Sequence, residues 1–492
     1  MFGIYQPLRT LCASIVLLVS IACTGQAAAQ AWTQLASTGG PPAGRDGHTA
    51  VFNTNHNRMV VFGGIGTSAF NDVWVLTNAD GTGGPSVWTQ LGPTGGPTPT
   101  RYLHSAVYDA ANNRMIVFAG FAGGSSCSNV ANDVWVLSNA DGTGGPPVWT
   151  QLSPTGGPTP LREFQSAVYD AATNRMIIFG GKTGLCQTRD NNVWILTNAN
   201  GLGGTPAWIQ LAPSGTAPTG RTGPQAIYNA ASNRMVIFGG FDNTLLTLND
   251  TWVLLDANGL GSPAWIQLSP TGGPPPKRTA DRSVYDPATN RMIVFGGGAD
   301  SGYSVVFNDL WVLSNADGTG GTPNWTQINP TGILPSARTL SSAIYNAANN
   351  RMVVFQGCNT GCGIDFNDTW VLAAANGVNF PVTIDIKAGV TPNIIRLATD
   401  RDITVAILST STFNAPASVD RASLSFGHTG NEASLTSCNT ASRDVDGDSR
   451  MDLVCHFSVL LEGFQLGDGL GYLRGLTLEG NAINGSDTVI VK

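Results

Sequence analysis

The densest group of carboxylates in the chain lies near its C-terminal end and has the spacing of a calcium loop. Four aspartates alternate with other residues there: Asp444, Asp446, Asp448 and Asp452. Calcium takes about six to eight oxygen ligands, and this spacing, with a main-chain oxygen from Arg450, can wrap oxygens around one ion. We predict a structural calcium site. The alternative is a solvated acidic turn, because Cys455 stands where an EF-hand loop ends in glutamate.

A second set of candidate residues consists of six arginines, one in each of six repeats, close to the start of a predicted strand. Guanidinium groups bind carboxylates and phosphates through paired hydrogen bonds, so six of them on one surface could hold an anionic ligand or an acidic peptide. The alternative is that each arginine bonds backbone carbonyl groups of its own or the adjacent repeat. We predict a ligand-binding role for these residues: Arg45, Arg101, Arg162, Arg221, Arg278 and Arg338.

The tryptophans define the elements that must position these side chains, because all 12 belong to two repeating series. The first series, in the context Trp-(Thr/Ile)-Gln-(Leu/Ile), is Trp32, Trp88, Trp149, Trp208, Trp265 and Trp325. The second, mostly within Asn-Asp-x-Trp-Val-Leu, is Trp74, Trp135, Trp194, Trp252, Trp311 and Trp370. Each repeat contains four short apolar runs separated by Asn- and Gly-rich turns. The pattern predicts an all-β fold, a six-bladed β-propeller over residues 32–376.

The two ends of this repeat region are expected to meet. A first tryptophan-bearing strand, residues 31–35, precedes the first complete blade, whereas the last blade has no fourth strand after Trp370. We expect the N-terminal strand to complete the sixth blade, which removes the exposed edges of an open sheet.

The blade pattern resembles that of the kelch family, which combines a double glycine after the second strand with an Asn-Asp-x-Trp third strand and a Trp-bearing fourth strand. The match covers residues 32–372, although the double glycine degenerates to Ala119-Gly120 and Gln356-Gly357. The resemblance implies that the loops joining strands four to one and two to three emerge on one face, with the six arginines near the rim of a central channel. The loops that vary in length and content lie on the same face: 121–131, 182–190, 241–248, 298–307 and 358–366. Variable loops on a rigid repeat usually carry recognition, so we predict a protein or carbohydrate ligand.

The same resemblance supplies an enzymatic alternative, because kelch propellers include copper-radical oxidases similar to galactose oxidase. That chemistry needs two histidines and two tyrosines around copper. His48 and His104 occupy equivalent positions in neighbouring blades, but the other blades carry Gln165, Pro224, Asp281 and Ser341 there. Neither a Gly-x-Ser-x-Gly nor a His-Glu-x-x-His motif is present. We therefore predict a non-catalytic binding or scaffolding protein, with a copper-radical or glycan-active enzyme as the alternative.

A second domain is expected over residues 381–492, because the tryptophans and the double glycines cease after Phe380. Alternating apolar runs in this region predict a small β-sandwich. It resembles a module found at the C-termini of exported bacterial proteins, and its acidic loop is similar to the short calcium loops of dockerin-like and integrin-like repeats.

Residues 1–31 have the pattern of a signal peptide, with Arg9 before an apolar run that ends at Cys23 and a small-residue segment after it. The run is too short to span a bilayer. We expect a secreted or extracytoplasmic protein without a transmembrane segment, and a lipid anchor on Cys23 is the alternative. The net charge of −7 argues against a nucleic-acid partner. The oligomeric state stays open.

Export makes disulfides the expected state of the six cysteines that follow the signal peptide. Cys358 and Cys362 share one glycine-rich loop, where a local disulfide is expected. Two further pairs follow from position, Cys127 with Cys186 in matching loops and Cys438 with Cys455 in the C-terminal region. Zinc is a competing use of Cys-x3-Cys, but neither a histidine nor a second cysteine pair lies nearby in the sequence to complete four ligands.

Overall fold

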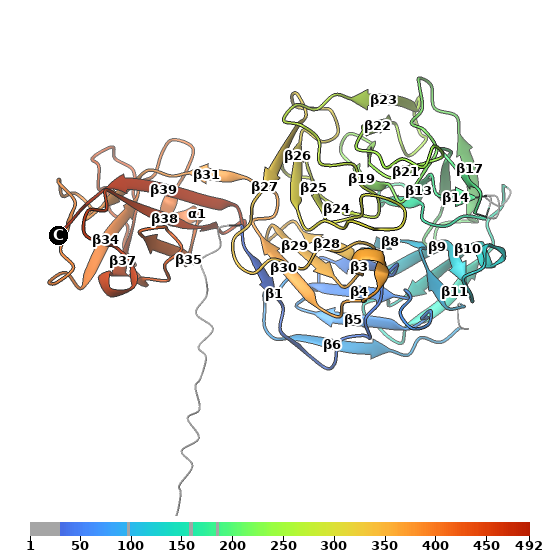
Figure 1. Cartoon of the computed structure of the whole chain (residues 1–492), viewed down its shortest axis with the longest axis horizontal. Helices are drawn as coiled ribbons and strands as arrows, with labels where there is room; N and C mark the ends of the chain where they lie inside the picture. The colour runs from blue at the N-terminus through green and yellow to red at the C-terminus, as the bar shows by residue number, and fades with distance from the viewer. Residues whose placement is uncertain (1–29, 96–98, 157–160, 184–185) are drawn as a thin grey trace, which may run out of the picture.

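The computed structural model describes residues 30–95, 99–156, 161–183 and 186–492. Six antiparallel sheets form a ring of blades, and two further sheets lie at one side of this ring (Figure 1). The predicted signal peptide lies almost wholly outside the described residues. Within them, no helix has the length and hydrophobicity needed to cross a membrane.

The six blades share one strand order, from the innermost strand at the axis to the outermost strand at the rim. Blade one contains β3 (Thr49–Asn53), β4 (Arg58–Phe62), β5 (Val73–Thr77) and β6 (Ser86–Leu91), with β2 (Ser37–Thr38) beside β6. Blade two contains β8 (Ser105–Asp109), β9 (Arg114–Ala122), β10 (Val130–Ser138) and β11 (Val148–Leu152), with β7 (Arg101–Tyr102) and the 3-10 turn η1 (Cys127–Asn129). Blade three contains β12 (Ser166–Asp170), β13 (Arg175–Phe179), β16 (Val193–Thr197) and β17 (Ala207–Leu211), with the loop pair β14 (Lys182–Thr183) and β15 (Thr188–Arg189).

The remaining blades repeat this arrangement. Blade four contains β19 (Gln225–Asn229), β20 (Arg234–Phe238), β22 (Thr251–Leu255) and β23 (Ala264–Leu268), with the loop pair β18 (Arg221–Thr222) and β21 (Phe241–Asp242). Blade five contains β24 (Arg282–Asp286), β25 (Arg291–Phe295), β26 (Leu310–Ser314) and β27 (Asn324–Ile328). Blade six contains β28 (Ser342–Asn346), β29 (Arg351–Phe355), β30 (Thr369–Ala373) and β1 (Trp32–Gln34), with the 3-10 turn η2 (Thr360–Cys362) in its loop.

The ring is closed by its N-terminal strand. β1 pairs antiparallel with β30, with Trp32 opposite Leu372 and Gln34 opposite Trp370. The sixth blade therefore takes its outermost strand from the start of the repeat region, as the strand count predicts.

Each pair of adjacent blades shares one apolar core, which explains the first tryptophan series. The tryptophan of every fourth strand packs on the phenylalanine that ends the second strand of the preceding blade, as Trp149 does on Phe62 with ring centroids 5.0 Å apart. The equivalent pair across the closure, Trp32 with Phe295, has the same separation of 5.0 Å. The methionine of each Asn-Arg-Met is fully buried in the same layer. These large contacts are the main apolar stabilisation between blades.

The face that carries the strand one-to-two and three-to-four turns is tied together by polar contacts between blades. The Arg58 guanidinium donates to the carbonyl oxygen of Asp141 in the next blade at 2.9 Å, and Arg351 of blade six donates to the Asp80 carbonyl of blade one at 3.2 Å. The Asp141 carboxylate also accepts a hydrogen bond from Asn53 of blade one. The arginine of each Asn-Arg-Met thus links one blade to the next on this face.

The C-terminal region forms a β-sandwich with its own core. One sheet contains β31 (Asn379–Pro381), β39 (Ala482–Thr488), β38 (Leu470–Thr477) and β35 (Val419–Gly427). The other contains β32 (Ile384–Ile386), β34 (Asp402–Ile407), β37 (Leu453–Ser458) and β36 (Leu435–Cys438). The smaller elements are β33 (Ile394–Ile395), β40 (Ile490–Val491), α1 (Ala415–Ser418) and η3 (Val459–Leu461).

This sandwich contacts blade six at its turns. The Asn350 side chain donates to the Gly480 carbonyl at 3.1 Å, and Asn376 donates to the Asn481 side chain at 3.2 Å. Asn350 lies in the one-to-two turn of blade six and Asn376 in the segment that follows its third strand, so the sandwich is anchored on the face opposite the variable loops.

The six cysteines in the described residues form three disulfides, and the pairing is the predicted one. The bonds join Cys127 to Cys186, Cys358 to Cys362 and Cys438 to Cys455. The first links the loops of blades two and three, the second closes a small ring within one loop of blade six, and the third joins β36 to β37.

Candidate functional site

The six repeated arginines are buried inside the blades, where each pairs with an aspartate of its own blade. Their exposed fractions are 0–1 %. In blade five, Arg278 donates to both carboxylate oxygens of Asp309, at 2.7 and 2.8 Å, and to the Gly296 carbonyl at 2.8 Å. The other pairs are Arg45 with Asp72, Arg101 with Asp133, Arg162 with Asp190, Arg221 with Asp250 and Arg338 with Asp368.

This placement corrects the prediction that these arginines bind a ligand. A guanidinium group that is out of solvent and already bonded to a carboxylate and a carbonyl oxygen has no surface to offer to an external anion. The alternative stated for these residues is the observed one, since each bonds a backbone carbonyl of its own blade. Each arginine also pairs with an aspartate. In the sequence this aspartate is visible only as part of the repeated Asn-Asp-x-Trp pattern, without a link to the arginine.

The arginine and aspartate fasten the four-to-one loop to the two-to-three loop of each blade at the mouth of the channel. Two residues beyond each arginine, the backbone forms a closed ring of six hydrogen bonds from blade to blade, 2.8–3.2 Å long. The residues of this ring are Gly47, Leu103, Phe164, Gly223, Ala280 and Leu340. All six have a left-handed backbone, with φ between 51° and 62°. The mouth is therefore a rigid frame on which neighbouring side chains have fixed positions.

The second glycine of the double-glycine motif is the one that every blade keeps. A Cβ atom at Gly297 would lie 2.8 Å from the Cβ and 3.0 Å from the backbone nitrogen of Asp281, and the φ of Gly297 is +99°. The second glycine is present in all six blades, whereas the first position carries Ala119 and Gln356 in two of them. The two departures from the family pattern both fall at the first position, although in the four blades that keep this glycine a Cβ atom would lie 2.4–2.8 Å from the carbonyl oxygen of the next blade's arginine.

Ionisable side chains that do not repeat gather at the channel mouth, and the sequence analysis did not identify them. We call them the mouth cluster: Asp46, Glu163, Arg282, Tyr303 and Asp365. They come from blades one, three, five and six. Their mutual proximity shows in the electrostatic effects of Asp46, Glu163 and Arg282 on the pKa of Tyr303, which burial raises.

Two carboxyl groups of the mouth cluster form a pair between the first and last blades. The side chains of Asp46 and Asp365 lie close enough for each to act on the pKa of the other. Burial, together with the neighbouring Asp365 carboxylate, raises the pKa of Asp46 to about 7. Burial also raises the pKa of Asp365. Such a pair changes its charge near neutral pH.

Burial shifts the pKa values of Glu163 and Arg282 so that the neutral form of each side chain is favoured. Burial raises the pKa of Glu163 to about 7, although the Lys182 ammonium lies 3.8 Å away. Burial lowers the pKa of Arg282 to about 10, against the opposing effect of the nearby Asp281 carboxylate. The Arg282 guanidinium donates to the main-chain oxygens of Ser341 and Asp281. Perturbed groups of this kind concentrate at functional sites.

The two histidines considered for copper join neighbouring blades. His48 Nε2 lies 2.8 Å from the Ser342 hydroxyl of blade six, and His104 Nε2 lies 2.7 Å from the Thr49 hydroxyl of blade one. Gln165 at the equivalent position of blade three bonds the Ser105 hydroxyl at 3.0 Å in the same way. Burial lowers the pKa of both histidines well below the usual value. Neither belongs to a cluster of three or more metal-ligating side chains in the described residues.

A polar cavity of ≈ 260 Å³ lies in the channel next to the hydrogen-bonded ring. Its lining includes His48, His104, Gln165 and the hydroxyl groups of the innermost strands, and Arg282 is the charged group among them. Where blade five places Arg282, the other blades have Thr49, Ser105, Ser166, Gln225 and Ser342. This position of the repeat is therefore neutral in five blades and cationic in one.

Exposed apolar side chains lie on three loops of the same face, in blades four to six. They are Leu245, Leu246, Val305 and Ile364, which are 53–66 % exposed. Their loops are joined to one another, because Thr247 donates to the Ala299 carbonyl at 2.8 Å and the Gly361 amide donates to the Tyr303 carbonyl at 3.0 Å. Exposed apolar side chains grouped on a rigid support are typical of a binding surface. We call this set the loop patch.

The acidic loop of the C-terminal sandwich gathers three of its four aspartates. Carboxylate oxygens of Asp444, Asp446 and Asp452 lie within 4.8 Å of one another. Asp452 is buried and accepts hydrogen bonds from the backbone amides of Ser409 and Val445, both at 2.8 Å. These bonds hold one carboxylate in place, as a cation site requires.

The fourth aspartate of this loop is differently engaged. Asp448 pairs with the Arg450 guanidinium at 2.7 Å, and hydrogen bonds from Arg450 lower the pKa of Asp448. Of the residues predicted as calcium ligands, Asp448 is thus neutralised by a side chain, while the main-chain oxygen of Arg450 stays a predicted ligand.

Comparison with known proteins identifies the family of the ring. A family model described as the KLHDC2/KLHL20/DRC7 Kelch-repeats domain matches residues 20–196, 84–254 and 174–378. These overlapping matches extend over all six blades. The chain is a kelch-repeat protein.

Curated relatives of this kelch propeller are longer proteins. The Leucine-zipper-like transcriptional regulator 1 homolog of Drosophila melanogaster is 32 % identical over 203 residues, which cover 40 % of this chain and 18 % of the relative. Adagio-like protein 1 of Oryza sativa subsp. japonica is 29 % identical over 210 residues, which cover 42 % of this chain and 30 % of the relative. The chain thus spans less than a third of the length of these relatives.

Two solved structures are also similar to the chain. The structure of YjhT is 14 % identical, covers 69 % of this chain and 96 % of its own, and has a TM-score of 0.48. A fungal alcohol oxidase of the AA5 family, in complex with copper, is 15 % identical, covers 94 % and 99 % respectively, and has a TM-score of 0.46.

We call each of the six buried arginines, together with its aspartate, a clamp. We predict that loss of one clamp arginine destabilises the kelch propeller. Arg278→Ala leaves the Asp309 carboxylate and the Gly296 carbonyl without their buried partner, at a cost of about 3 to 5 kcal/mol. The adjacent Lys277 is exposed, so Lys277→Ala should change the free energy of unfolding by less than about 0.5 kcal/mol. Denaturant unfolding followed by tryptophan fluorescence measures both. Equal unfolding curves for the two variants would contradict the structural role assigned to the clamp.

We also predict a pH dependence from Asp281. Both oxygens of this buried carboxyl group lack a hydrogen-bond partner within the described residues, and burial raises its pKa from 3.8 to about 7. The native state therefore holds a proton that the unfolded chain has lost, and the free energy of unfolding falls as pH rises from 3.8 to about 7, by at most about 1.4 kcal/mol per pH unit.

Replacement of this carboxyl group by an amide tests the effect. Asp281→Asn should remove this part of the slope, so the variant gains stability relative to the wild type as pH rises from 4 to 8, and the exposed Glu479→Gln serves as the control. Thermal melts across this pH range measure the difference. Parallel profiles for wild type and Asp281→Asn would show that Asp281 is ionised in the native state.

Proposed function

We propose that this kelch propeller is an exported, non-catalytic binding protein that recognises a protein or carbohydrate ligand on the face of its variable loops. The observation that carries the proposal is the contrast between the two faces. Repeated residues tie blades together on one face, whereas the mouth cluster and the loop patch bring non-repeated charged and apolar side chains to the other. Binding residues commonly lie on loops held by a rigid scaffold.

Export is supported by the disulfides. Three bonds within one chain are typical of proteins that fold in an oxidising compartment. One of them, between Cys127 and Cys186, ties together loops of the proposed binding face. A disulfide at this place reduces the freedom of the loops and so the entropy lost when a ligand binds.

The enzymatic alternative receives no support from the residues that would carry it. His48 and His104 use their Nε2 atoms to join blades, in the way that Gln165 does without any metal-binding capacity. We therefore favour recognition over oxidation as the role of this face.

The binding face can be tested with two leucines of equal size on opposite faces. Leu245 is 66 % exposed in the loop patch, and Leu260 is 60 % exposed in a three-to-four turn on the opposite face. The protein is first screened on a glycan array and a peptide library, and binding of the strongest hit is measured by interferometry. Leu245→Asp should weaken it more than about tenfold, equivalent to about 1.4 kcal/mol, while Leu260→Asp should not.

The backbone at residue 245 makes the first variant a mild one for folding. Its φ is +65°, a conformation that aspartate adopts more readily than leucine. A ligand that binds Leu245→Asp as tightly as wild type, or a screen without any binder, would refute the proposed role of this face.

We further propose that the acidic loop of the sandwich binds calcium as a structural ion. Asp444, Asp446 and Asp452 offer three carboxylates of appropriate chemistry for a hard cation. The ion would neutralise their repulsion and hold the segment that precedes β37 in one conformation.

Calcium should therefore raise the melting temperature of the protein, and chelation should lower it. Ligand at about a hundred times its dissociation constant adds about 2.7 kcal/mol to the free energy of unfolding. Asp446→Asn should abolish this response, whereas Asp448→Asn, which alters the aspartate paired with Arg450, should retain most of it. Melts with calcium and with a chelator, beside metal analysis of the purified protein, provide the measurement. Identical melts of the wild type in both conditions would exclude a structural ion.

A further inference from the structure

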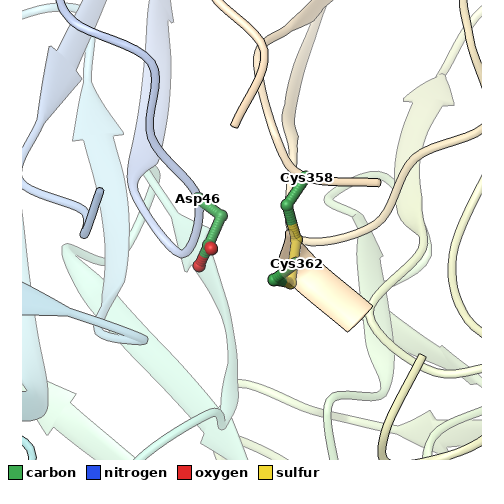
Figure 2. Close-up of side chains that lie close together, drawn as sticks. All are labelled: Asp46, Cys358 and Cys362. Carbon is green, nitrogen blue, oxygen red and sulfur yellow. A yellow bond between two sulfur atoms is a disulfide. The ribbon is translucent and has the colours of Figure 1, made fainter. Parts of the chain in front are cut away.

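A disulfide and a carboxylate lie together at the channel mouth, on segments from opposite ends of the repeat region. Cys358 and Cys362 belong to the two-to-three loop of blade six, and Asp46 follows the clamp arginine of blade one. Figure 2 shows Asp46 beside this disulfide, with the two on segments from different blades. A carboxylate oxygen of Asp46 and both sulfur atoms lie within 4.8 Å of one another.

These three side chains are a partial ligand set for a thiophilic metal. Zinc takes four ligands in a tetrahedron, with bonds of about 2.3 Å to thiolates and about 2.0 to 2.2 Å to carboxylates. Ligand atoms of such a site lie roughly 3.5 to 3.8 Å apart, so the present spacing needs only small side-chain movements. While the cysteines are joined to each other, however, their sulfurs cannot act as two thiolate ligands.

A further carboxylate, that of Asp365, lies near these three but outside their 4.8 Å group. Asp365 is the β-bridge partner of Cys358, and its carboxylate lies close enough to act on the pKa of Asp46. Its Oδ1 atom is buried and has no hydrogen-bond partner in the described part of the chain. Ring closure thus supplies the Asp46 oxygen, which the sequence around Cys-x3-Cys lacks, whereas Asp365 comes from the same loop of blade six as the two cysteines.

We propose that reduction of the Cys358–Cys362 disulfide creates a zinc site formed by Cys358, Cys362, Asp46 and Asp365. Two molecules of a small thiol reduce the disulfide and are themselves joined in a disulfide, which leaves. Cys358 and Cys362 each then carry a free thiol group. Zn²⁺ then replaces the two thiol protons, which pass to solvent, and binds the aspartates as carboxylates. Metal binding would thereby depend on the redox state of the loop. This inference is independent of any ligand of the loop face.

Cobalt provides a direct spectroscopic test, because Co²⁺ bound by thiolates has a sulfur-to-metal charge-transfer band that carboxylate sites lack. The full chain is reduced under anaerobic conditions with a phosphine, and Co²⁺ and then Zn²⁺ are titrated. The reduced wild type should develop the band stoichiometrically and lose it when Zn²⁺ is added. The oxidised protein should show none.

Variants separate this site from the other cysteines and from the acidic loop. Cys358→Ser with Cys362→Ser should abolish the band, and Asp46→Asn should weaken metal affinity more than about tenfold. Asp446→Asn should leave the band unchanged. Circular dichroism checks that each variant is folded.

Three results would overturn the proposal. The first is a reduced wild type without the band, and the second is the same band in the double serine variant, which would place the metal on another cysteine pair. The third is unchanged affinity in folded Asp46→Asn, which would remove the carboxylate from the site.

Discussion

Each blade depends on a buried arginine that must find a carboxylate. A guanidinium group that is 0–1 % exposed has lost its hydration, and this cost is offset only when the charge is paired and its N–H groups are bonded. The aspartate at the start of the third strand and the carbonyl that follows the second strand meet both requirements. Since the arginine precedes the first strand, this single contact holds the entry of the first strand against the junction between the second and third. The loops of one face consequently emerge from a fixed base.

The closed ring of backbone hydrogen bonds extends this constraint from one blade to six. Each ring residue lies two positions after a clamp arginine, so the clamp determines where its amide and carbonyl groups point. The ring leaves the side chains of the intervening residues, among them Asp46 and Glu163, free to differ between blades. The backbone ring is therefore the same in every blade, while the side chains between each arginine and its ring residue can differ.

The fold was largely predictable because its main contacts repeat. Trp149, Met115 and the turn asparagines recur with their partners in every blade, and each recurrence signals a contact that every blade makes. The role of the arginines was assigned wrongly for a specific reason. Arg278 and Asp309 are 31 residues apart, and their recurrence was considered separately. Only the strand directions show that both lie at one end of the blade. In five blades the paired aspartate precedes the tryptophan of the third strand by two positions. In blade three Asp190 precedes Trp194 by four positions and still pairs with the arginine.

The mouth cluster was not predictable in the same way. Asp46 and Asp365 meet only because the first and last blades are neighbours in a closed ring, a contact that no local pattern encodes. A usable signal did exist, namely a charged residue at a repeat position that is neutral in the other blades, as for Arg282. The opposite face shows why such residues concentrate at the mouth. There, Arg58, Asp141 and their counterparts link each blade to the next, and the C-terminal sandwich is anchored on blade six. A substitution on that face breaks a contact between blades. A substitution of a non-repeated side chain at the mouth leaves the backbone ring and the clamps intact, so a specific site can arise there at little cost in stability.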